Sequence, residues 1–234
     1  MPGLANVRQI VTNQLLDFAA MAEINVGILG SGDVGKALAR GFAGSGHQVR
    51  IGSRSPEKLA DFSNATKGVG AATFSESAAF GDLIAIATLG TATEEAITLA
   101  GAKNFDGKVV IDATNPLDFS GGMPPRLFVG HTDSLGERVQ RWLPGAKVVK
   151  AFNTVGNAFF VRPDLPGGPP DMFIAGNDAE AKTSVAQICK QWGWGVIDTG
   201  GIESSRYLEA MCMVWVLHGA LSGSWTHAFK MLHK

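Results

Sequence analysis

The sequence predicts an α/β fold in which helices cover both faces of a doubly wound parallel sheet. Short runs that are apolar at nearly every position, such as 83–87 and 109–112, are typical of strands buried on both faces. Segments with helical spacing of apolar residues alternate with these runs. A glycine-rich turn at 30–35 joins the first run to the first helical segment. Glycine accounts for 30 of the 234 residues and follows no fixed period, which excludes a collagen-like chain.

The expected elements follow one another in the order β-α-β-α-β. In the first part of the chain, strands are expected at 24–29, 48–52, 83–87, 109–112 and 148–152, and helices at 33–43, 57–64, 93–100 and 134–142. A loop rich in Pro and Gly at 162–170 precedes a strand at 172–175, a helix at 179–192 and a strand at 195–198. The last helix is expected from about 205 to 232, with a possible break near 219–223. Apolar residues surround this helix, which indicates burial in the core or against another subunit.

We divide the chain into three parts. Residues 1–22 form an N-terminal extension, 23–165 a dinucleotide-binding domain and 166–234 an α/β lobe that ends in a buried or dimer-forming helix. Because Met21 directly precedes the first expected strand, residues 1–20 are either a short added helix or an extension before the natural start.

Composition excludes several classes of protein. The charges nearly balance, with 20 basic and 21 acidic residues, so a nucleic-acid footprint is not expected. The two cysteines, Cys189 and Cys212, lie too far apart for a CxxC pair, which excludes a disulfide scaffold and a structural zinc site. No apolar run reaches the length of a membrane span. These features predict a cytoplasmic protein without nucleic-acid or membrane partners and without a metal site.

A turn of the pattern GxGxxG lies between the first expected strand and its helix. The first glycine permits the tight turn, the second lets a pyrophosphate approach the backbone, and the third lets the helix lie close to the sheet. The helix N-terminus adds unpaired N–H groups and the positive end of its dipole. Asp33 is also expected to cap this helix. We therefore expect dinucleotide binding at Gly30, Ser31, Gly32, Asp33, Val34 and Gly35.

The same residues also approach GxxxxGK, the phosphate-binding loop of NTPases. That loop requires Ser or Thr after the lysine to bind magnesium, whereas Ala37 follows Lys36 here. The turn therefore favours a dinucleotide over a nucleoside triphosphate.

The end of the second expected strand indicates which dinucleotide is bound. An NAD site usually has Asp or Glu about 20 residues after the glycine turn, where it binds the ribose 2′-hydroxyl. This chain has Ser53, Arg54 and Ser55 there, with Lys58 one turn later. Arginine clamps a phosphate bidentately, whereas a carboxylate repels it. The sequence predicts NADP(H) rather than NAD(H); the alternative is a solvated basic turn without a ligand.

Polar residues also follow three later strands. Open α/β sheets bind ligands beyond the carboxyl ends of their strands, and Thr or Asn side chains there suit a carboxamide or the edge of a flat ring. Single residues of this kind more often form turns, so it is their joint placement that favours a site. The candidates are Thr88, Leu89, Asn115, Pro116, Phe152, Asn153, Thr154 and Val155.

From about residue 24 to about residue 217 the chain resembles the F420-dependent NADP oxidoreductases. The similar segments are GSGDVGKALA at 30–39, GSRSPEK at 52–58, KAFNTV at 150–155 and DTGGIESSRYLEAM at 198–211. The resemblance implies a dinucleotide-binding domain and a small, largely helical C-terminal lobe, commonly in a homodimer. It also implies that Ser53, Arg54 and Lys58 hold the NADP 2′-phosphate and that Thr88, Leu89 and 153–155 lie beside the nicotinamide.

Asn153 separates two groups within this resemblance. The archaeal deazaflavin enzymes have His at this position, whereas KAFN is more similar to the cytosolic oxidoreductase domain of the STEAP metalloreductases. Those proteins pass electrons from NADPH to a flavin. The resemblance therefore implies NADP(H) together with coenzyme F420 or a flavin, FAD or FMN.

These observations predict an oxidoreductase that transfers a hydride between NADPH and a deazaflavin or flavin, with Asn153 and Thr154 orienting the rings. Such a transfer needs two stacked rings rather than an acid–base residue, so no catalytic side chain is expected. One alternative is an NADPH-dependent reductase of free flavin, ferric chelates or a small carbonyl or imine. Another is a non-catalytic NADP(H) sensor that acts through its C-terminal helix. The expected partners are a small redox acceptor and a second copy of the chain.

Overall fold

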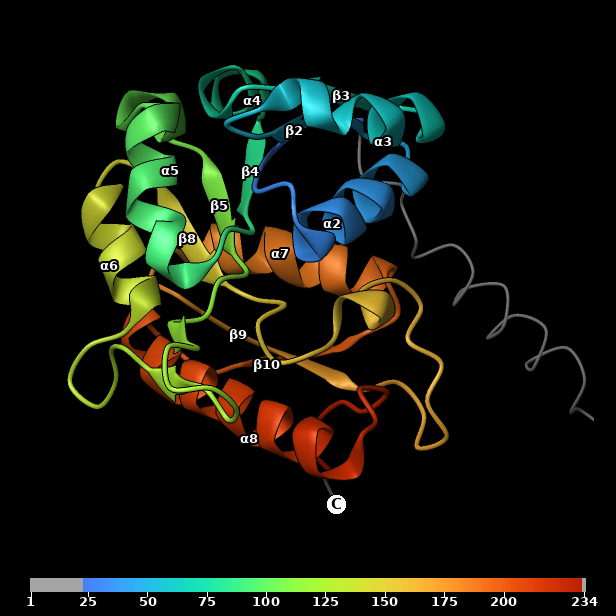
Figure 1. The fold of residues 1–234 in the computed structure, drawn as a ribbon, viewed down its shortest axis with the longest axis vertical. Helices are drawn as coiled ribbons and strands as arrows, with labels where there is room; N and C mark the ends of the chain where they lie inside the picture. Colours follow the sequence, from blue (N-terminus) through green and yellow to red (C-terminus); the bar gives the residue numbers. More distant parts are fainter. Residues whose placement is uncertain (1–22, 233–234) are drawn as a thin grey trace, which may run out of the picture.

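The computed structural model describes residues 23–232 and builds them around one sheet of eight strands (Figure 1). The strand order is β10-β9-β8-β5-β4-β1-β2-β3. Neighbouring strands are parallel throughout, except that β8 and β9 are antiparallel. The doubly wound, Rossmann-like fold class is therefore confirmed.

The strands of this sheet are short. They are β1 (Asn25–Leu29), β2 (Gln48–Gly52), β3 (Val69–Ala72), β4 (Leu83–Ile86), β5 (Val109–Asp112), β8 (Lys147–Lys150), β9 (Asp171–Gly176) and β10 (Gly195–Asp198). The α-helices are α2 (Asp33–Gly44), α3 (Ala60–Ala65), α4 (Phe74–Phe80), α5 (Thr93–Ala100), α6 (Leu135–Trp142), α7 (Ala179–Gln191) and α8 (Ser205–Ser222). Short 3-10 turns are η1 (Pro56–Leu59), η2 (Gly90–Ala92), η3 (Ala102–Phe105), η4 (Asn157–Phe159) and η5 (Ile202–Ser204). A hairpin of β6 (Leu117–Asp118) and β7 (Arg126–Leu127) completes the list.

Two hydrophobic clusters cover the two faces of the sheet. Phe42 of α2 and Trp192, which follows α7, pack in one cluster, where their rings meet edge to face at 4.9 Å. Helices α4, α5 and α6 supply the other, including Phe74 and Leu135. Ile28 and Leu29 are neighbours on β1 yet enter different clusters. Both faces of the central strands are therefore buried, which explains their continuous apolar sequence.

The sequence pattern did not predict two elements, strand β3 and helix α4. Strand β3 lies at the edge and contains a single β-branched residue, Val69, so its signal is weak. Helix α4 follows directly and is short. The signal that could have found it is a capping box, in which Thr73 and Glu76 bond reciprocally at the start of the helix.

The C-terminal helix differs from the expectation. Helix α8 ends at Ser222, the next residue, Gly223, has a left-handed φ of 68°, and the chain does not resume a helix up to residue 232. It returns instead toward β9, where the backbone N–H of Asp171 donates to the carbonyl of Phe229 at 2.9 Å. The expected break is thus observed, and the expected helix beyond it is wrong.

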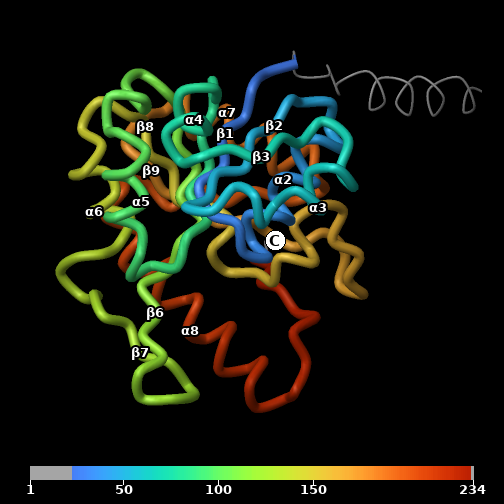
Figure 2. The backbone as a smooth tube through the Cα atoms, turned by 45° about the horizontal axis from the view of Figure 1, so that its top comes forward, coloured from blue at the N-terminus to red at the C-terminus, as the bar shows by residue number. Residues whose placement is uncertain are grey.

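Strands β9 and β10 continue the sheet past β8, whereas α8 and the hairpin β6–β7 extend together on one side of it (Figure 2). The proposed division at 165/166 therefore falls in the connection from β8 to β9, and it stays a prediction. The expected extension at 1–22 lies outside the residues that the structure describes. Within 23–232, none of the helices combines the length and apolar character needed to cross a bilayer.

Candidate functional site

The turn after β1 has the geometry that its glycines predict. Gly30 has a φ of 122°, and a Cβ there would collide with the carbonyl of Ala87 on the neighbouring strand. A Cβ on Gly35 would collide with the carbonyl of Gly30, so this glycine lets α2 lie against the turn. A Cβ on Gly32 would meet no protein atom within 4 Å, which leaves open space in front of the helix N-terminus.

Asp33 does not cap α2 as expected. Gly32 occupies the N-cap position and Asp33 is the first residue of the helix, so its side chain makes no capping hydrogen bond. Its exposed carboxylate lies instead at the mouth of the neighbouring cavity.

That cavity, of about 680 Å³, lies beyond the carboxyl ends of β1, β2 and β4, and we call it the dinucleotide cavity. It unites predicted residues from three separate turns: Gly30, Ser31, Gly32, Asp33, Val34, Ser53, Arg54, Ser55, Lys58, Thr88 and Leu89. Ser53 links two of these turns, because its Oγ accepts from the backbone N–H of Ser55 at 3.1 Å and from Ser31 Oγ at 3.4 Å. Arg54 Nη1 lies 3.7 Å from Glu95 Oε2, and both side chains are exposed.

Several residues that line this cavity were not predicted from the sequence. Phe74 comes from α4, and Glu95 and Ala96 from α5. Asn157 begins η4 and reaches the cavity from the far side of α2. No local pattern marks these positions, because each is placed by the packing of helices that are distant in sequence.

A second cavity, of about 370 Å³, adjoins the first, and we call it the acceptor pocket. The two share Val34 and Asn157 in their walls. Five predicted residues line it: Val34, Asn115, Phe152, Asn153 and Val155. Its other walls include the hairpin residue Leu117 and, from the C-terminal region, Cys212, Trp215, Val216 and Trp225. Three predicted residues, Gly35, Pro116 and Thr154, line neither cavity.

Two asparagines form one wall of the acceptor pocket. Asn115 Nδ2 donates to the carbonyl of Asn153 at 2.8 Å, and Asn153 Nδ2 donates back to Asn115 Oδ1 at 3.0 Å. Asn153 Nδ2 also donates to the carbonyl of Leu208 on α8 at 3.0 Å. Asn153 is 3% exposed, and its Oδ1 has no hydrogen-bond partner among the described residues. Buried acceptors are normally satisfied, so this oxygen is one of few exceptions among the described residues.

Another part of the wall is aromatic. The Trp215 and Trp225 rings lie 5.2 Å apart, and His227 stacks on Trp215 at 4.9 Å. Trp215 Nε1 donates to the carbonyl of His227 at 2.8 Å, which ties α8 to the segment that follows it. This wall was not predicted, because Trp225 reaches the pocket, and His227 reaches Trp215, only through the reversal of the chain at Gly223.

A buried ion cluster lies behind the asparagines. Lys150 Nζ is fully buried and lies 2.8 Å from Asp112 Oδ2, from Glu209 Oε1 and from the carbonyl of Thr114. The Glu209 carboxylate also accepts the backbone N–H groups of Leu135 and Gly136 at the start of α6, each at 2.9 Å. Burial disfavours the charge of Lys150, but its two carboxylate partners outweigh burial and hold its pKa above the usual lysine value. The cluster therefore ties β5, β8, α6 and α8 together at the carboxyl edge of the sheet.

The cysteine of the acceptor pocket is not activated as a nucleophile. Burial is the main cause that raises the pKa of Cys212 to about 12, so its thiol stays protonated near neutral pH. Among residues 23–232, no group of three or more His, Cys, Asp and Glu side chains is placed to hold a metal ion.

Comparison with known proteins bears on this arrangement. A family model described as NADP oxidoreductase, coenzyme F420-dependent, matches residues 25–116. The F420-dependent NADP reductase of Methanocaldococcus jannaschii is 32% identical over 197 residues, which are 78% of this chain and 86% of that protein. The chain belongs to the F420-dependent NADP oxidoreductase family. It is accordingly an NADP-dependent oxidoreductase, and the predicted resemblance is confirmed.

Two further relatives extend this family assignment. A crystal structure from Arthrobacter sp. FB24, assigned as an F420-dependent NADP reductase, superposes with a TM-score of 0.86 at 40% identity, over 90% of this chain and all of that one. Metalloreductase STEAP3 of Rattus norvegicus is 29% identical over 87% of this chain. The chain spans 41% of the length of that metalloreductase, so the similarity concerns one part of it.

Proposed function

We propose that this chain transfers a hydride between NADPH and a deazaflavin or flavin bound in the acceptor pocket. The observation that carries the proposal is the small pocket lined by the side chains of Asn115 and Asn153, which shares Val34 and Asn157 with the dinucleotide cavity. An amide oxygen there suits the N–H edge of a flat heterocycle or of a carboxamide. The family assignment supports the cofactor class, since its named members are F420-dependent NADP reductases.

The residues of the dinucleotide cavity fit NADPH. Open space in front of Gly32 gives a pyrophosphate access to the N-terminus of α2. Arg54, Lys58 and the hydroxyls of Ser53 and Ser55 suit a 2′-phosphate. In this proposal, Gly30, Ser31, Asp33, Val34 and Gly35 shape the phosphate turn, and Thr88 and Leu89 lie along the nicotinamide ribose.

Bound NADPH would supply the hydride itself, so the chain's task is to orient the two rings and to exclude water from them. Asn115 and Asn153 fix one another through two hydrogen bonds and hold both side chains in the wall of the pocket. The Trp215 and Trp225 rings close the other side against solvent. Phe152 and Val155 add apolar surface to the wall. Two rings stacked between these walls would meet at reacting distance.

NADPH oxidation by the purified protein tests this proposal directly. Coenzyme F420, FMN, FAD and a ferric chelate are offered in parallel, and absorbance follows both reactants. We expect reduction of the deazaflavin or of a flavin at a rate proportional to enzyme. Reduction of the ferric chelate alone, or no turnover with any acceptor, would contradict the proposal. The Asn153→Ala variant is expected to lose turnover, while Asn104→Ala, an amide outside both cavities, leaves it unchanged.

We also propose that the exposed face of α8 forms a homodimer. Tyr207, Val214 and Leu221 are 73, 57 and 87% exposed, although the helix is apolar on most sides. Light scattering after size exclusion tests this assembly. A double variant with Val214→Glu and Leu221→Glu is expected to elute as a monomer. If the wild-type protein is itself a monomer at micromolar concentration, the proposed homodimer is contradicted.

A further inference from the structure

The chain from 223 to 232, which follows α8 and which we call the strap, runs back to the start of β9. Hydrogen bonds hold it at two places. Trp215 Nε1 of α8 donates to the carbonyl of His227 at 2.8 Å, and the carbonyl of Phe229 accepts the backbone N–H of Asp171 at 2.9 Å. In both bonds the strap takes part through its backbone. Its path is therefore held without help from the side chains at its other positions.

Trp225 is the residue through which the strap reaches the acceptor pocket. The residue is 43% exposed, so its indole ring stands between the pocket and solvent. The ring lies 5.2 Å from the Trp215 ring, at an angle of 45° to it. The position of the Trp225 ring therefore decides how much room the pocket leaves for an acceptor and how well solvent is kept out.

Gly219 on α8 makes the space that the Trp225 ring occupies. A Cβ at residue 219 would collide with Cε3 and Cζ3 of that ring. Glycine weakens the interior of a helix relative to alanine, so a buried glycine in α8 needs a packing reason, and close contact with the indole supplies it. Gly219 itself lines neither the dinucleotide cavity nor the acceptor pocket. It can therefore influence the pocket through the ring that packs on it.

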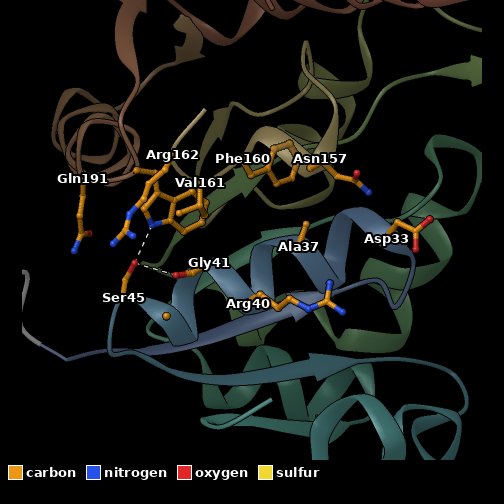
Figure 3. A pocket seen from close by; sticks show the side chains of 13 residues that line it. Asp33, Ala37, Arg40, Gly41, Ser45, Asn157, Phe160, Val161, Arg162 and Gln191 are labelled. Carbon is orange, nitrogen blue, oxygen red and sulfur yellow. Dashed lines mark hydrogen bonds between the residues drawn. The ribbon is translucent and has the colours of Figure 1, made fainter. Parts of the chain in front are cut away.

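Gly156 bounds the same aromatic pair from another element. A Cβ there would lie 3.2 Å from Trp215 Cζ2 and 3.3 Å from the carbonyl oxygen of Trp225. Gly156 leads into segment 157–162, which faces α2 across a groove of about 880 Å³ (Figure 3). Phe160 of this segment is buried in the core, which fixes the backbone around Gly156. If the Trp225 ring is displaced, it must move toward the pocket or toward solvent, and either movement changes the fit of an acceptor.

From this geometry we infer that Trp225 determines how a ring acceptor fits the acceptor pocket, and that Gly219 is a positioning residue that acts through Trp225. The inference rests on the proposed function and deepens it, because it assigns the fit of the ring to the strap. A flat ring that packs against an indole gains from the buried area and from the geometry of the two rings. Since the strap is held by its backbone, residue 225 can be exchanged while the strap keeps its path.

A double-mutant cycle tests this assignment. The probes are lumiflavin and 5-deazalumiflavin, which are bare three-ring molecules, and their fluorescence in the presence of NADP⁺ gives their affinity. We expect Trp225→Ala and Gly219→Ala each to weaken the binding of the probes roughly five- to tenfold, the usual worth of one aromatic contact. The affinity for NADPH should stay within about twofold. The double variant should bind the probes as Trp225→Ala does, because the alanine at 219 then has no indole to displace.

Three further variants serve as controls. Phe119→Ala removes a ring that is 52% exposed and lies outside the acceptor pocket, and Gly44→Ala adds a methyl group at the end of α2, where a Cβ meets no protein atom within 4 Å. Neither should change the affinity for the probes. Trp225→Phe keeps a ring in the wall and should lose less affinity than Trp225→Ala. Equal losses in these two variants would overturn the aromatic contact.

Binding separates this inference from the proposed function, because it is measured whether or not hydride transfer occurs. The expected cycle in a protein without turnover would support the role of Trp225 and contradict the proposed function. Turnover with unchanged probe affinity in both single variants would do the reverse. Additive losses in the double variant would show that Gly219 acts by another route, and would overturn its role as a positioning residue. No binding of either probe to the wild-type protein would overturn the inference as a whole.

Discussion

The dinucleotide cavity and the acceptor pocket lie side by side but are assembled in different ways. Most of the dinucleotide cavity comes from two turns within residues 30–58, each of which follows its own strand. Apart from Val34, the acceptor pocket takes its walls from four distant segments, around 113–117, 152–158, 212–216 and residue 225. Backbone geometry at a few glycines is enough to shape the dinucleotide cavity. The acceptor pocket exists only when long-range contacts hold those four segments together.

Lys150 is central to those long-range contacts. Its partners Asp112 and Glu209 belong to β5 and α8, and Lys150 itself ends β8. Three residues after each member of the cluster, the chain supplies a residue of the acceptor pocket wall: Asn115, Asn153 and Cys212. A disturbance of the cluster should therefore affect the acceptor pocket more than the dinucleotide cavity.

Lys150→Met is expected to have the largest effect. It leaves two buried carboxylates without their cation, which costs about 3–5 kcal/mol of the free energy of unfolding. Urea denaturation measures that loss. Affinity for NADPH in the remaining folded protein should change less than the KM of the acceptor. A loss below about 1 kcal/mol, or an NADPH affinity that falls as much as acceptor affinity, would contradict this account.

The matched control for Lys150→Met removes the orphaned charges as well. In the triple variant with Asp112→Asn and Glu209→Gln, the buried groups are neutral and of similar volume. We expect it to regain about 2 kcal/mol of the free energy of unfolding, since neutral replacements of buried ion clusters are often tolerated. If the triple variant is no more stable than Lys150→Met, uncompensated charge is not the cause.

Gly32→Val tests the dinucleotide cavity and separates nucleotide binding from folding. A Cβ at this position meets no protein atom within 4 Å, so the melting temperature of the variant should equal that of the wild type. The side chain would enter the space proposed for the pyrophosphate, and we expect NADPH and NADH affinities to fall on the order of 100-fold, about 3 kcal/mol. Titration of both nucleotides measures this, with Gly167→Val, equally open in the structure, as control. Unchanged NADPH affinity would refute the assignment of the turn.

The same contrast explains what the sequence could predict. The turn at 30–35 and the basic end of β2 were readable because their chemistry is carried by contiguous residues at fixed spacing. Asn115 and Asn153 could be proposed because both follow strand ends, but their mutual hydrogen bonds could not be inferred from spacing. Trp225 was missed because it reaches the pocket by a chain reversal at Gly223, and no period or motif encodes that path.

Arg54→Glu tests whether the dinucleotide cavity prefers NADPH to NADH. Replacing a charge-assisted donor by a carboxylate should weaken NADPH binding by about 2–3 kcal/mol, because it removes one attraction and adds a repulsion. NADH lacks the 2′-phosphate, so its affinity should stay within about threefold. Isothermal titration with each nucleotide measures both values. Equal losses for NADPH and NADH would show that Arg54 does not face a 2′-phosphate.

Glu95→Gln is expected to have the smallest effect, in the opposite direction. Glu95 Oε2 lies 3.7 Å from Arg54 Nη1 in the dinucleotide cavity, where its charge competes for the arginine and opposes a phosphate. Both side chains are more than half exposed, so solvent screens their pairing and its removal costs little stability. NADPH should bind about two- to fourfold tighter to the variant, and the gain should shrink at high salt. Glu94→Gln, the neighbouring carboxylate outside the cavity, should give no such gain. If both variants behave alike, the gain reflects net charge, and the pair at Arg54 plays no part in choosing between NADPH and NADH.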